Sequence, residues 1–248
     1  MGLPAKNFPF TLEQIKAEKA ERRLRDFIPM AWRIIKPKAE FIGGWHVDAM
    51  ADHLEAVARS EIKNLLITIP PRYTKSTTVC VCWPAWTWLH SPEFQWLFSA
   101  YAASLAIRDS VLCRRVIESE WYQGNWGDRF YLTTDQNEKS RFDNSVSGRR
   151  IATGLVGGTG EGGDCIVVDD PNNINDQWYP SKLEAAINEW DQVMSQRVND
   201  ENARKVIIMQ RISNKDLAAH VLSQGGYEHL MIPQEYDPKR SKVTAIGW

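Results

Sequence analysis

The residues whose types and spacing point most directly to chemistry lie between positions 65 and 77. An apolar run over residues 65–69 is followed by a loop with a basic, hydroxyl-rich end: Pro70, Pro71, Arg72, Tyr73, Thr74, Lys75, Ser76 and Thr77. A buried strand, a tight loop and a helix that opens with Lys and a hydroxyl residue together predict a phosphate-binding loop. Backbone N–H groups at the helix start surround anionic oxygens, while Lys75 reaches the terminal phosphates and Ser76 completes a Mg²⁺ shell.

The loop departs from the usual glycine pattern at two positions. Ile69 and Thr74 stand where a standard loop of this kind has glycine. Thr74 matters more, because the backbone just before the lysine normally needs to be unhindered. An ordinary strand-to-helix turn with a surface Lys75 is the alternative interpretation, so a second motif is needed to decide between them.

A second motif of the required kind lies further along the chain. The apolar residues 165–168 end in the paired carboxylates Asp169 and Asp170, and Pro171 then stops the strand. In such a strand the first acid holds Mg²⁺ through water, and the second orients or deprotonates the attacking water. Asp169 is therefore the predicted metal residue and Asp170 the predicted catalytic carboxylate. A polar turn is the alternative, but the two motifs together favour nucleotide hydrolysis.

Length and composition limit the remaining classes of protein. The 248 residues are enough for one α/β domain with a full core, and the net charge of -1 argues against a strongly basic nucleic-acid binder. None of the four cysteines belongs to a Cys/His cluster with zinc-binding spacing, so we expect reduced, buried thiols. The longest apolar-looking stretch, residues 79–89, is too short to span a bilayer. We therefore expect a soluble, intracellular protein without a membrane partner.

Strand-like runs alternate with helical segments along most of the chain. The predicted strands are Asn64–Ile69, Phe94–Ala100, Arg150–Thr153, Cys165–Asp169 and Lys205–Met209. The predicted helices are Thr11–Ile35, Trp45–Arg59, Lys75–Leu89, Ser104–Ser119, Ser181–Val198 and Lys215–Ser223. This alternation predicts an α/β fold of the P-loop NTPase type, with a mainly parallel central sheet flanked by helices and a small helical, lid-like N- or C-terminal subdomain. We expect a tail and helix over residues 1–35 and the P-loop ATPase domain over residues 36–248.

The candidate site residues follow strands, as parallel sheets require. Polar segments come directly after apolar runs at 72–77, 99–101, 169–170 and 210–211. Because open parallel sheets bind ligands outside the carboxyl ends of their strands, we expect these segments to meet at one edge.

Five separated motifs, taken in order, resemble one protein family. They are Trp45-His46, Pro70-Pro71-Arg72-x-x-Lys75-Ser76, Gly160-x-Gly162-x-Asp164, Asp169-Asp170-Pro171 and Gln210-Arg211-x-x-x-x-Asp216-Leu217. The set resembles the ATPase domain of phage large terminase subunits, which pump double-stranded DNA into an empty viral procapsid. A nuclease domain follows in that family. Since the sequence stops about where that domain would begin, we expect ATP hydrolysis without DNA cleavage.

The resemblance implies roles for individual residues. Arg72 corresponds to an arginine that senses or stabilises the γ-phosphate, and Thr77 is at most an auxiliary phosphate contact. Gln210 and Arg211 match a coupling motif that contacts the γ-phosphate and loses that contact on hydrolysis. Trp45 and His46 stand on the adenine side, with simple packing as the alternative. Pro71, Tyr73 and Thr74 complete the nucleotide-binding loop around Lys75 and Ser76.

A packaging ring also implies an arginine that reaches into a neighbour's active site. Related sequences often have a basic residue in the Gly-rich segment where this chain has Glu161. The candidates for the trans arginine are then Arg149, Arg150 and Arg141, with a solvated surface role as the alternative for each.

The same resemblance implies the cofactors and partners. ATP and Mg²⁺ are the expected cofactors, and the expected partners are double-stranded DNA contacted through phosphates, a portal protein and the small terminase subunit. We expect a homo-oligomeric ring on assembly, a monomer being allowed in isolation, and location in the host cell cytoplasm. The alternatives are a helicase-like nucleic-acid-dependent ATPase and a nucleotide-binding assembly module with little hydrolysis.

Overall fold

The sheet is the centre of the structure. The computed structural model describes residues 10–156 and 160–248, so residues 1–9 of the predicted tail lie outside the described part. Eight strands form one sheet in the order β3-β4-β5-β2-β6-β7-β1-β8. Their bounds are β1 Asn64–Thr68, β2 Gln95–Ala100, β3 Leu132–Asn137, β4 Arg141–Asn144, β5 Arg149–Gly154, β6 Cys165–Asp169, β7 Arg204–Met209 and β8 Glu228–Met231. The run from β5 to β8 is parallel, and β3 and β4 add an antiparallel edge.

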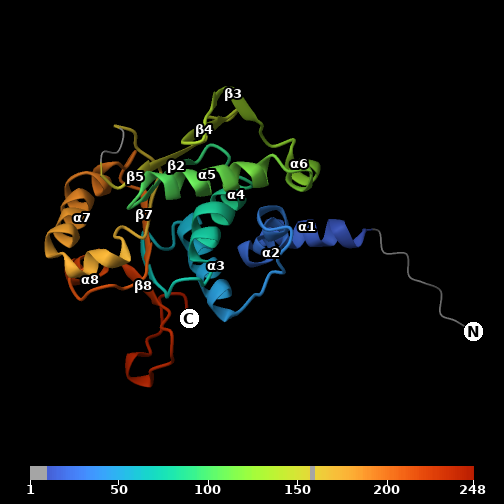
Figure 1. The fold of residues 1–248 in the computed structure, drawn as a ribbon. Helices are drawn as coiled ribbons and strands as arrows, with labels where there is room; N and C mark the ends of the chain where they lie inside the picture. The colour runs from blue at the N-terminus through green and yellow to red at the C-terminus, as the bar shows by residue number, and fades with distance from the viewer. Residues whose placement is uncertain (1–9, 157–159) are drawn as a thin grey trace, which may run out of the picture.

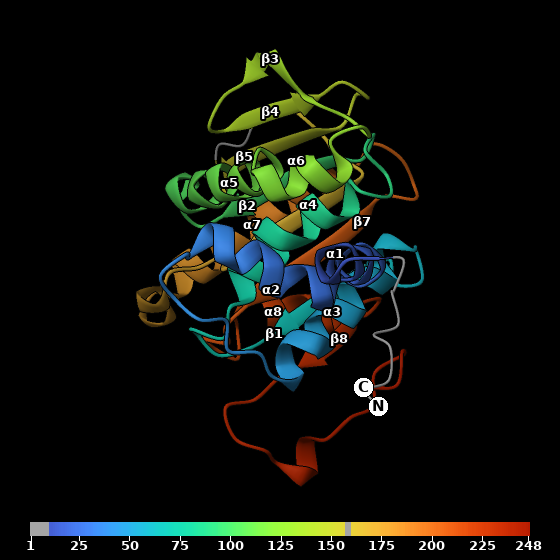
Figure 2. The ribbon, with the colours of Figure 1, turned by 90° about the vertical axis from the view of Figure 1, so that its right-hand side faces the viewer.

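Helices cover both faces of this sheet, as Figure 1 shows. On one face lie α7 (Pro180–Gln192) and α8 (Leu217–Gln224). On the other lie α2 (Leu24–Ile35), α3 (Trp45–Ala58), α4 (Trp83–Thr87) and α5 (Ala103–Ile117), with α1 (Leu12–Arg22) and α6 (Glu120–Trp126) beyond them. Figure 2 looks onto this second, thicker layer. The predicted α/β fold with a mainly parallel, helix-flanked sheet is confirmed.

Burial on both faces explains why the central strands are readable from sequence. Every residue of β6 is buried, and successive residues of β1 point into opposite apolar clusters, Leu65 and Ile67 into one and Leu66 into the other. Parallel strands that are covered on both faces carry continuous apolar runs rather than alternating ones. The N-terminal helices join the same core, since Ala20, Leu24 and Phe27 are fully buried in the cluster that contains Leu65. A domain boundary at residue 35 stays a prediction.

The segment predicted as one helix from Thr11 to Ile35 is two helices with a break at Arg23. The backbone of Arg23 is extended, with φ −136° and ψ 127°. The carboxylate of Glu55, a buried residue of α3, accepts a hydrogen bond from the Leu24 N–H at 2.7 Å and pairs with the Arg23 guanidinium at 3.1 Å. A distant carboxylate therefore caps α2, which local sequence does not reveal.

The helix after the phosphate-binding loop begins as a π-helix. Its first part, η1 (Thr77–Cys82), has π geometry, and α4 follows with Pro84 in its first turn. A proline has no N–H and its ring crowds the carbonyl four residues earlier, here that of Cys80. The Cys80 carbonyl instead accepts a hydrogen bond at 2.8 Å from Nη2 of Arg150, which is fully buried in β5. The Arg150 guanidinium also lies over the Phe98 ring at 4.1 Å.

The turn between β4 and β5 leaves no space for a side chain at Gly148. Asn144 Oδ1 accepts from the Gly148 N–H at 2.9 Å, and Asn144 Nδ2 donates to the Pro92 carbonyl at 2.7 Å. A Cβ atom on Gly148 would lie 1.9 Å from that carbonyl oxygen.

The variant Gly148→Ala should therefore be less stable. Relieving the overlap displaces the Asn144 contacts, and overpacking of this kind costs about 1–3 kcal/mol of unfolding free energy. Gly124→Ala is the matched control, because this exposed glycine of α6 has no atom near its Cβ position, and a helical alanine should add about 0.5–1 kcal/mol. Urea denaturation of both variants measures the difference. Equal stability of Gly148→Ala and wild type would show that the turn moves aside freely.

Candidate functional site

A cavity of about 690 Å³ lies at the carboxyl ends of β1, β2, β6 and β7. The segments that follow these four strands all reach it, as the strand-end pattern predicts. Of the predicted site residues, its lining includes Pro71, Arg72, Thr74, Lys75, Ser76, Thr77, Asp169, Asp170 and Gln210. The structure thus brings the phosphate-binding loop and the carboxylate pair together across the sheet.

The loop reaches the helix through left-handed backbone conformations. Arg72 has φ 69° and Thr74 has φ 59°. A positive φ is unusual for residues other than glycine and is an outlier for a β-branched side chain. The Thr74 carbonyl accepts the Thr78 N–H at 2.9 Å, so the first helical turn starts directly from this strained residue. Thr74 therefore has a backbone conformation that glycine adopts more readily.

Lys75 is the charge at the centre of the cavity. Only 6 % of its surface is exposed, and its ammonium group donates to Asp169 at 3.3 Å and also to Asp170. Burial lowers the pKa of a lysine, but the attraction of both carboxylates outweighs it and leaves the pKa of Lys75 raised. The ammonium is therefore charged and held where β6 ends.

The neighbouring charges of Lys75 and Asp169 also act on Asp170. Its backbone is left-handed, with φ 44°, and its Oδ1 accepts a hydrogen bond at 3.1 Å from the Gln210 N–H. Burial raises the pKa of Asp170, and repulsion from Asp169 adds to this against the attraction of Lys75. A carboxylate with a raised pKa is a better proton acceptor.

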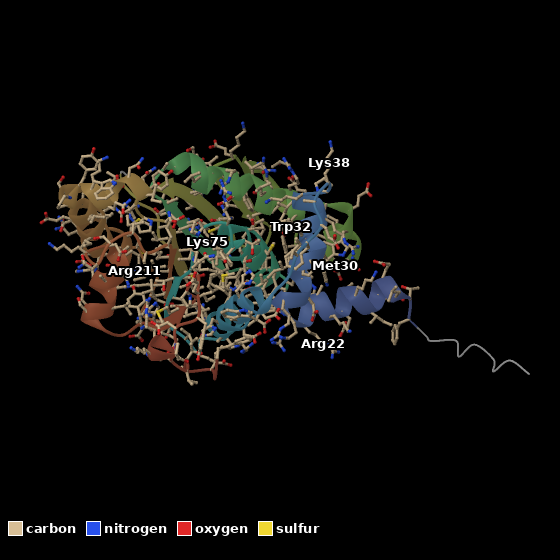
Figure 3. All side chains as sticks on the ribbon, turned by 60° about the horizontal axis from the view of Figure 1, so that its bottom comes forward. Arg22, Met30, Trp32, Lys38, Lys75 and Arg211 are labelled. Atoms are coloured by element: carbon tan, nitrogen blue, oxygen red, sulfur yellow. The ribbon has the colours of Figure 1, made fainter. Side chains whose placement is uncertain are left out.

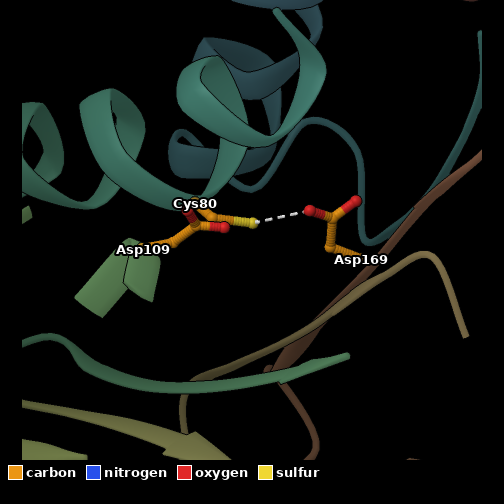
Figure 4. Close-up of side chains that lie close together, drawn as sticks. All are labelled: Cys80, Asp109 and Asp169. Carbon is orange, nitrogen blue, oxygen red and sulfur yellow. Dashed lines mark hydrogen bonds between the residues drawn. The ribbon is translucent and has the colours of Figure 1, made fainter. Parts of the chain in front are cut away.

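A second group of polar side chains lies behind Asp169, as Figure 4 shows. The Cys80 thiol donates to Asp169 Oδ2 at 3.8 Å, and one ligand atom each of Cys80, Asp109 and Asp169 lies within 4.8 Å of the others. Mg²⁺ prefers oxygen to sulfur. The carboxylates of Asp169 and Asp109 and the hydroxyl of Ser76, which all line the cavity, are oxygen donors of the kind that fits that ion.

Some predicted residues lie away from this cavity. Trp45 is 60 % exposed and lines a separate cavity of about 230 Å³ beside the C-terminal segment. The His46 ring packs against the Tyr73 ring with centroids 5.2 Å apart. The Arg211 guanidinium pairs with Asp216 at 3.0 Å and lines a neighbouring cavity that shares Gln210 with the main one. In the view of Figure 3, Lys75 lies between Arg211 on one side and Trp32 on the other.

The three arginines proposed to act in trans differ in accessibility. Arg149, at the start of β5, and Arg141, at the start of β4, both pair with Glu161, at 2.9 and 3.1 Å, and all three side chains are partly exposed. Arg150 has no exposed surface and is held inside by Cys80 and Phe98. Its side chain does not reach the molecular surface.

The residues on the helical side of the cavity are not predicted from any sequence motif. Two helices far apart in the chain provide this side: α2 contributes Trp32 and Ile35, with Lys36 directly after it, and α5 contributes Leu105, Arg108, Asp109 and Leu112. None of these belongs to a motif with fixed spacing. Only the position of α5 directly after β2, a strand whose carboxyl end was already suspected, could have pointed to Arg108.

The architecture of this chain is similar to that of a known group of proteins. No protein-family model and no curated protein matches the sequence. Among solved structures, the large terminase of bacteriophage HK97 matches with a TM-score of 0.54 and 15 % identity over 88 % of this chain and 45 % of that one. The fold of this chain is similar to that of part of a phage large terminase. Large terminase from a thermophilic bacteriophage gives TM-scores of 0.48 and, in a complex with ADP, 0.44, at 11 % and 12 % identity, in each case over 90 % of this chain and under half of that one.

At 15 % identity, the similarity to a terminase describes the architecture of the chain alone. The chain spans less than half the length of HK97 large terminase. Over that part, its helix-flanked α/β sheet is similar in architecture to the HK97 protein. In the described residues, no helix is long and apolar enough to cross a membrane.

Replacing Thr74 by glycine should relieve the left-handed backbone of the phosphate-binding loop. We expect Thr74→Gly to raise the unfolding free energy by about 1 kcal/mol, because glycine adopts positive φ without steric cost. Thr74→Ala is the control: it removes the hydroxyl that donates to the Tyr73 carbonyl at 2.7 Å but keeps a Cβ atom. Thermal and urea unfolding of both variants give the comparison. A glycine variant no more stable than the alanine variant would show that the loop carries no such strain.

Proposed function

We propose that this chain is the ATP-hydrolysing motor domain of a viral DNA-packaging terminase, which translocates double-stranded DNA into a procapsid. One observation carries the proposal: the buried Lys75 ammonium lies between Asp169 and Asp170 where parallel strands end in a cavity. A lysine in a strand-to-helix loop opposite paired acids is the arrangement that binds and hydrolyses nucleoside triphosphates. The terminase fold supports the packaging role.

Each residue then has a defined task. The phosphates of ATP enter beside the loop, and Lys75 exchanges part of its contact with the carboxylates for contact with phosphate oxygens. Ser76 and Asp169 would hold Mg²⁺, and that ion would supply positive charge against the phosphates. Asp170 accepts a proton from the attacking water as the water oxygen bonds to the γ-phosphorus and the bond to the ADP oxygen breaks. Arg72 lines the cavity near the loop and stabilises the charge that moves to the leaving phosphates.

Coupling to movement runs through the end of β7. The Gln210 N–H is bonded to Asp170, and the next residue, Arg211, is bonded to Asp216 at the start of α8. A change in the charge on Asp170 during hydrolysis therefore acts directly on the segment that leads into α8.

The partners of the proposed motor follow from its task. A packaging motor binds duplex DNA through phosphates without reading bases, and with a net charge of -1 this chain has a limited contact patch. Portal protein, the small terminase subunit and further copies of the chain in a ring complete the proposed assembly, in the host cell cytoplasm. Two measurements would separate this function from that of a helicase. Duplex DNA should stimulate phosphate release, and the protein should not unwind a forked duplex.

Loss of Lys75 should abolish tight ATP binding. In Lys75→Ala the phosphates lose their cation and Asp169 and Asp170 face them unneutralised, so we expect ATP affinity to fall about a hundredfold or more. Lys63→Ala is the control, since Lys63 is exposed at the opposite end of β1. Titration calorimetry with Mg²⁺ and ATP measures both variants. Retained affinity in Lys75→Ala would remove the phosphate-binding loop from the proposal.

Loss of the Asp170 charge should separate binding from hydrolysis. Asp170→Asn cannot accept a proton, so we expect ATP binding within about threefold of wild type and phosphate release slowed by about 10²–10⁴-fold. The exposed Asp128→Asn controls for the loss of one negative charge. Phosphate release is followed over a series of protein concentrations, because an active site completed between subunits gains activity as they meet. Near-normal turnover of Asp170→Asn would exclude Asp170 as the base. Binding without turnover in wild type at every concentration would favour an assembly module.

A further inference from the structure

Arg108 is a cation of the cavity that none of the motifs contains. It lies on α5 and lines the same cavity as Lys75 and Asp170, on the side formed by α2 and α5. About half of its side chain is exposed. Its position on α5, after β2, places it outside the phosphate-binding loop.

The guanidinium of Arg108 is oriented by its neighbour. Nε donates to Asp109 Oδ1 at 2.8 Å and Nη2 donates to Oδ2 at 3.1 Å, so one edge of the planar group is fully used. The second edge, formed by Nη1 and Nη2, keeps Nη1 without a hydrogen bond to any described residue. A guanidinium with one edge anchored and the other free is preorganised to bind a tetrahedral anion with two parallel hydrogen bonds.

The anchor is itself rigid. Asp109 has 3 % of its surface exposed, and one of its oxygens lies within 4.8 Å of Cys80 Sγ and of an Asp169 oxygen. The Arg108 guanidinium is therefore only one carboxylate away from the predicted metal residue. The hydrogen bonds to Asp109 raise the pKa of Arg108, so its charge persists at every physiological pH.

We propose that Arg108 binds the terminal phosphate of the nucleotide from the side of the cavity opposite Lys75, with Asp109 as its positioning residue. This inference rests on the proposed function and adds to it a phosphate-binding cation supplied by the same chain. In this arrangement the third phosphate lies between Lys75 and Arg108, and a diphosphate lacks the group that Arg108 contacts. Arg108 then distinguishes ATP from ADP, whereas Lys75 contacts both.

The test compares a triphosphate with a diphosphate. Binding of AMP-PNP and of ADP, each with Mg²⁺, is measured by titration calorimetry for wild type, Arg108→Gln, Arg108→Lys and Arg115→Gln. Arg115→Gln is the matched control, because Arg115 is an exposed arginine of the same helix that does not line the cavity. We expect Arg108→Gln to weaken AMP-PNP binding roughly ten- to hundredfold and ADP binding less than about threefold. Arg108→Lys keeps the positive charge but cannot donate two parallel hydrogen bonds, so its AMP-PNP affinity should lie between those of wild type and Arg108→Gln.

Several results would overturn the assignment. Equal losses for AMP-PNP and ADP would mean that Arg108 supports the fold of the cavity, and no loss would mean that it contacts neither. Weaker binding of duplex DNA with unchanged AMP-PNP binding would assign Arg108 to a nucleic-acid phosphate. Wild-type protein that binds neither nucleotide would refute the proposed function and this inference together. Melting temperatures identify any variant that is unfolded, and Arg108→Lys then carries the comparison.

Discussion

The structure of the cavity depends on one buried charge, the ammonium of Lys75. An unpaired ammonium in a protein interior costs several kcal/mol, and the two adjacent carboxylates of Asp169 and Asp170 would repel each other without it. Each partner therefore needs the other, and the pairing fixes the loop after β1 against the end of β6 across the sheet. Of the five described non-glycine residues with positive φ, three lie in this cavity: Arg72, Thr74 and Asp170. Backbone strain is concentrated where the ionic contact compensates it.

A second constraint lies behind the loop. Pro84 prevents a regular helix at Cys80, and the buried Arg150 donates to the carbonyl that the proline cannot serve. This contact connects η1 to β5 and so fixes the helix that begins at the phosphate-binding loop. It also explains why an arginine that the sequence offers as a surface group has no exposed surface. Its role follows from a proline 66 positions earlier in the chain, a relation that only the fold reveals.

How far the sequence predicts the structure depends on how local the causes are. The central strands are predicted almost to the residue, because burial on both faces leaves a continuous apolar run, as in β6. The edge strands carry no such pattern: β3 contains exposed polar residues, and only one residue of β8 is fully buried. The break at Arg23 and the position of Arg108 both depend on contacts with other elements. Motif spacing identified the residues along the strand ends, whereas the helical side of the cavity has no fixed spacing to recognise.

Glu161 links the remaining arginines to this picture. The resemblance to terminases marks it as a departure, an acid where a basic residue is common, yet its carboxylate pairs with both Arg141 and Arg149. All three side chains are partly exposed, and pairs of this kind contribute only about 0–1 kcal/mol, so either arginine can exchange Glu161 for a phosphate of a neighbouring subunit at small cost. Arg150 would instead have to abandon a buried carbonyl and an aromatic ring. The three candidates therefore differ in the energetic cost of releasing the side chain, and this cost is lower for Arg141 and Arg149 than for Arg150.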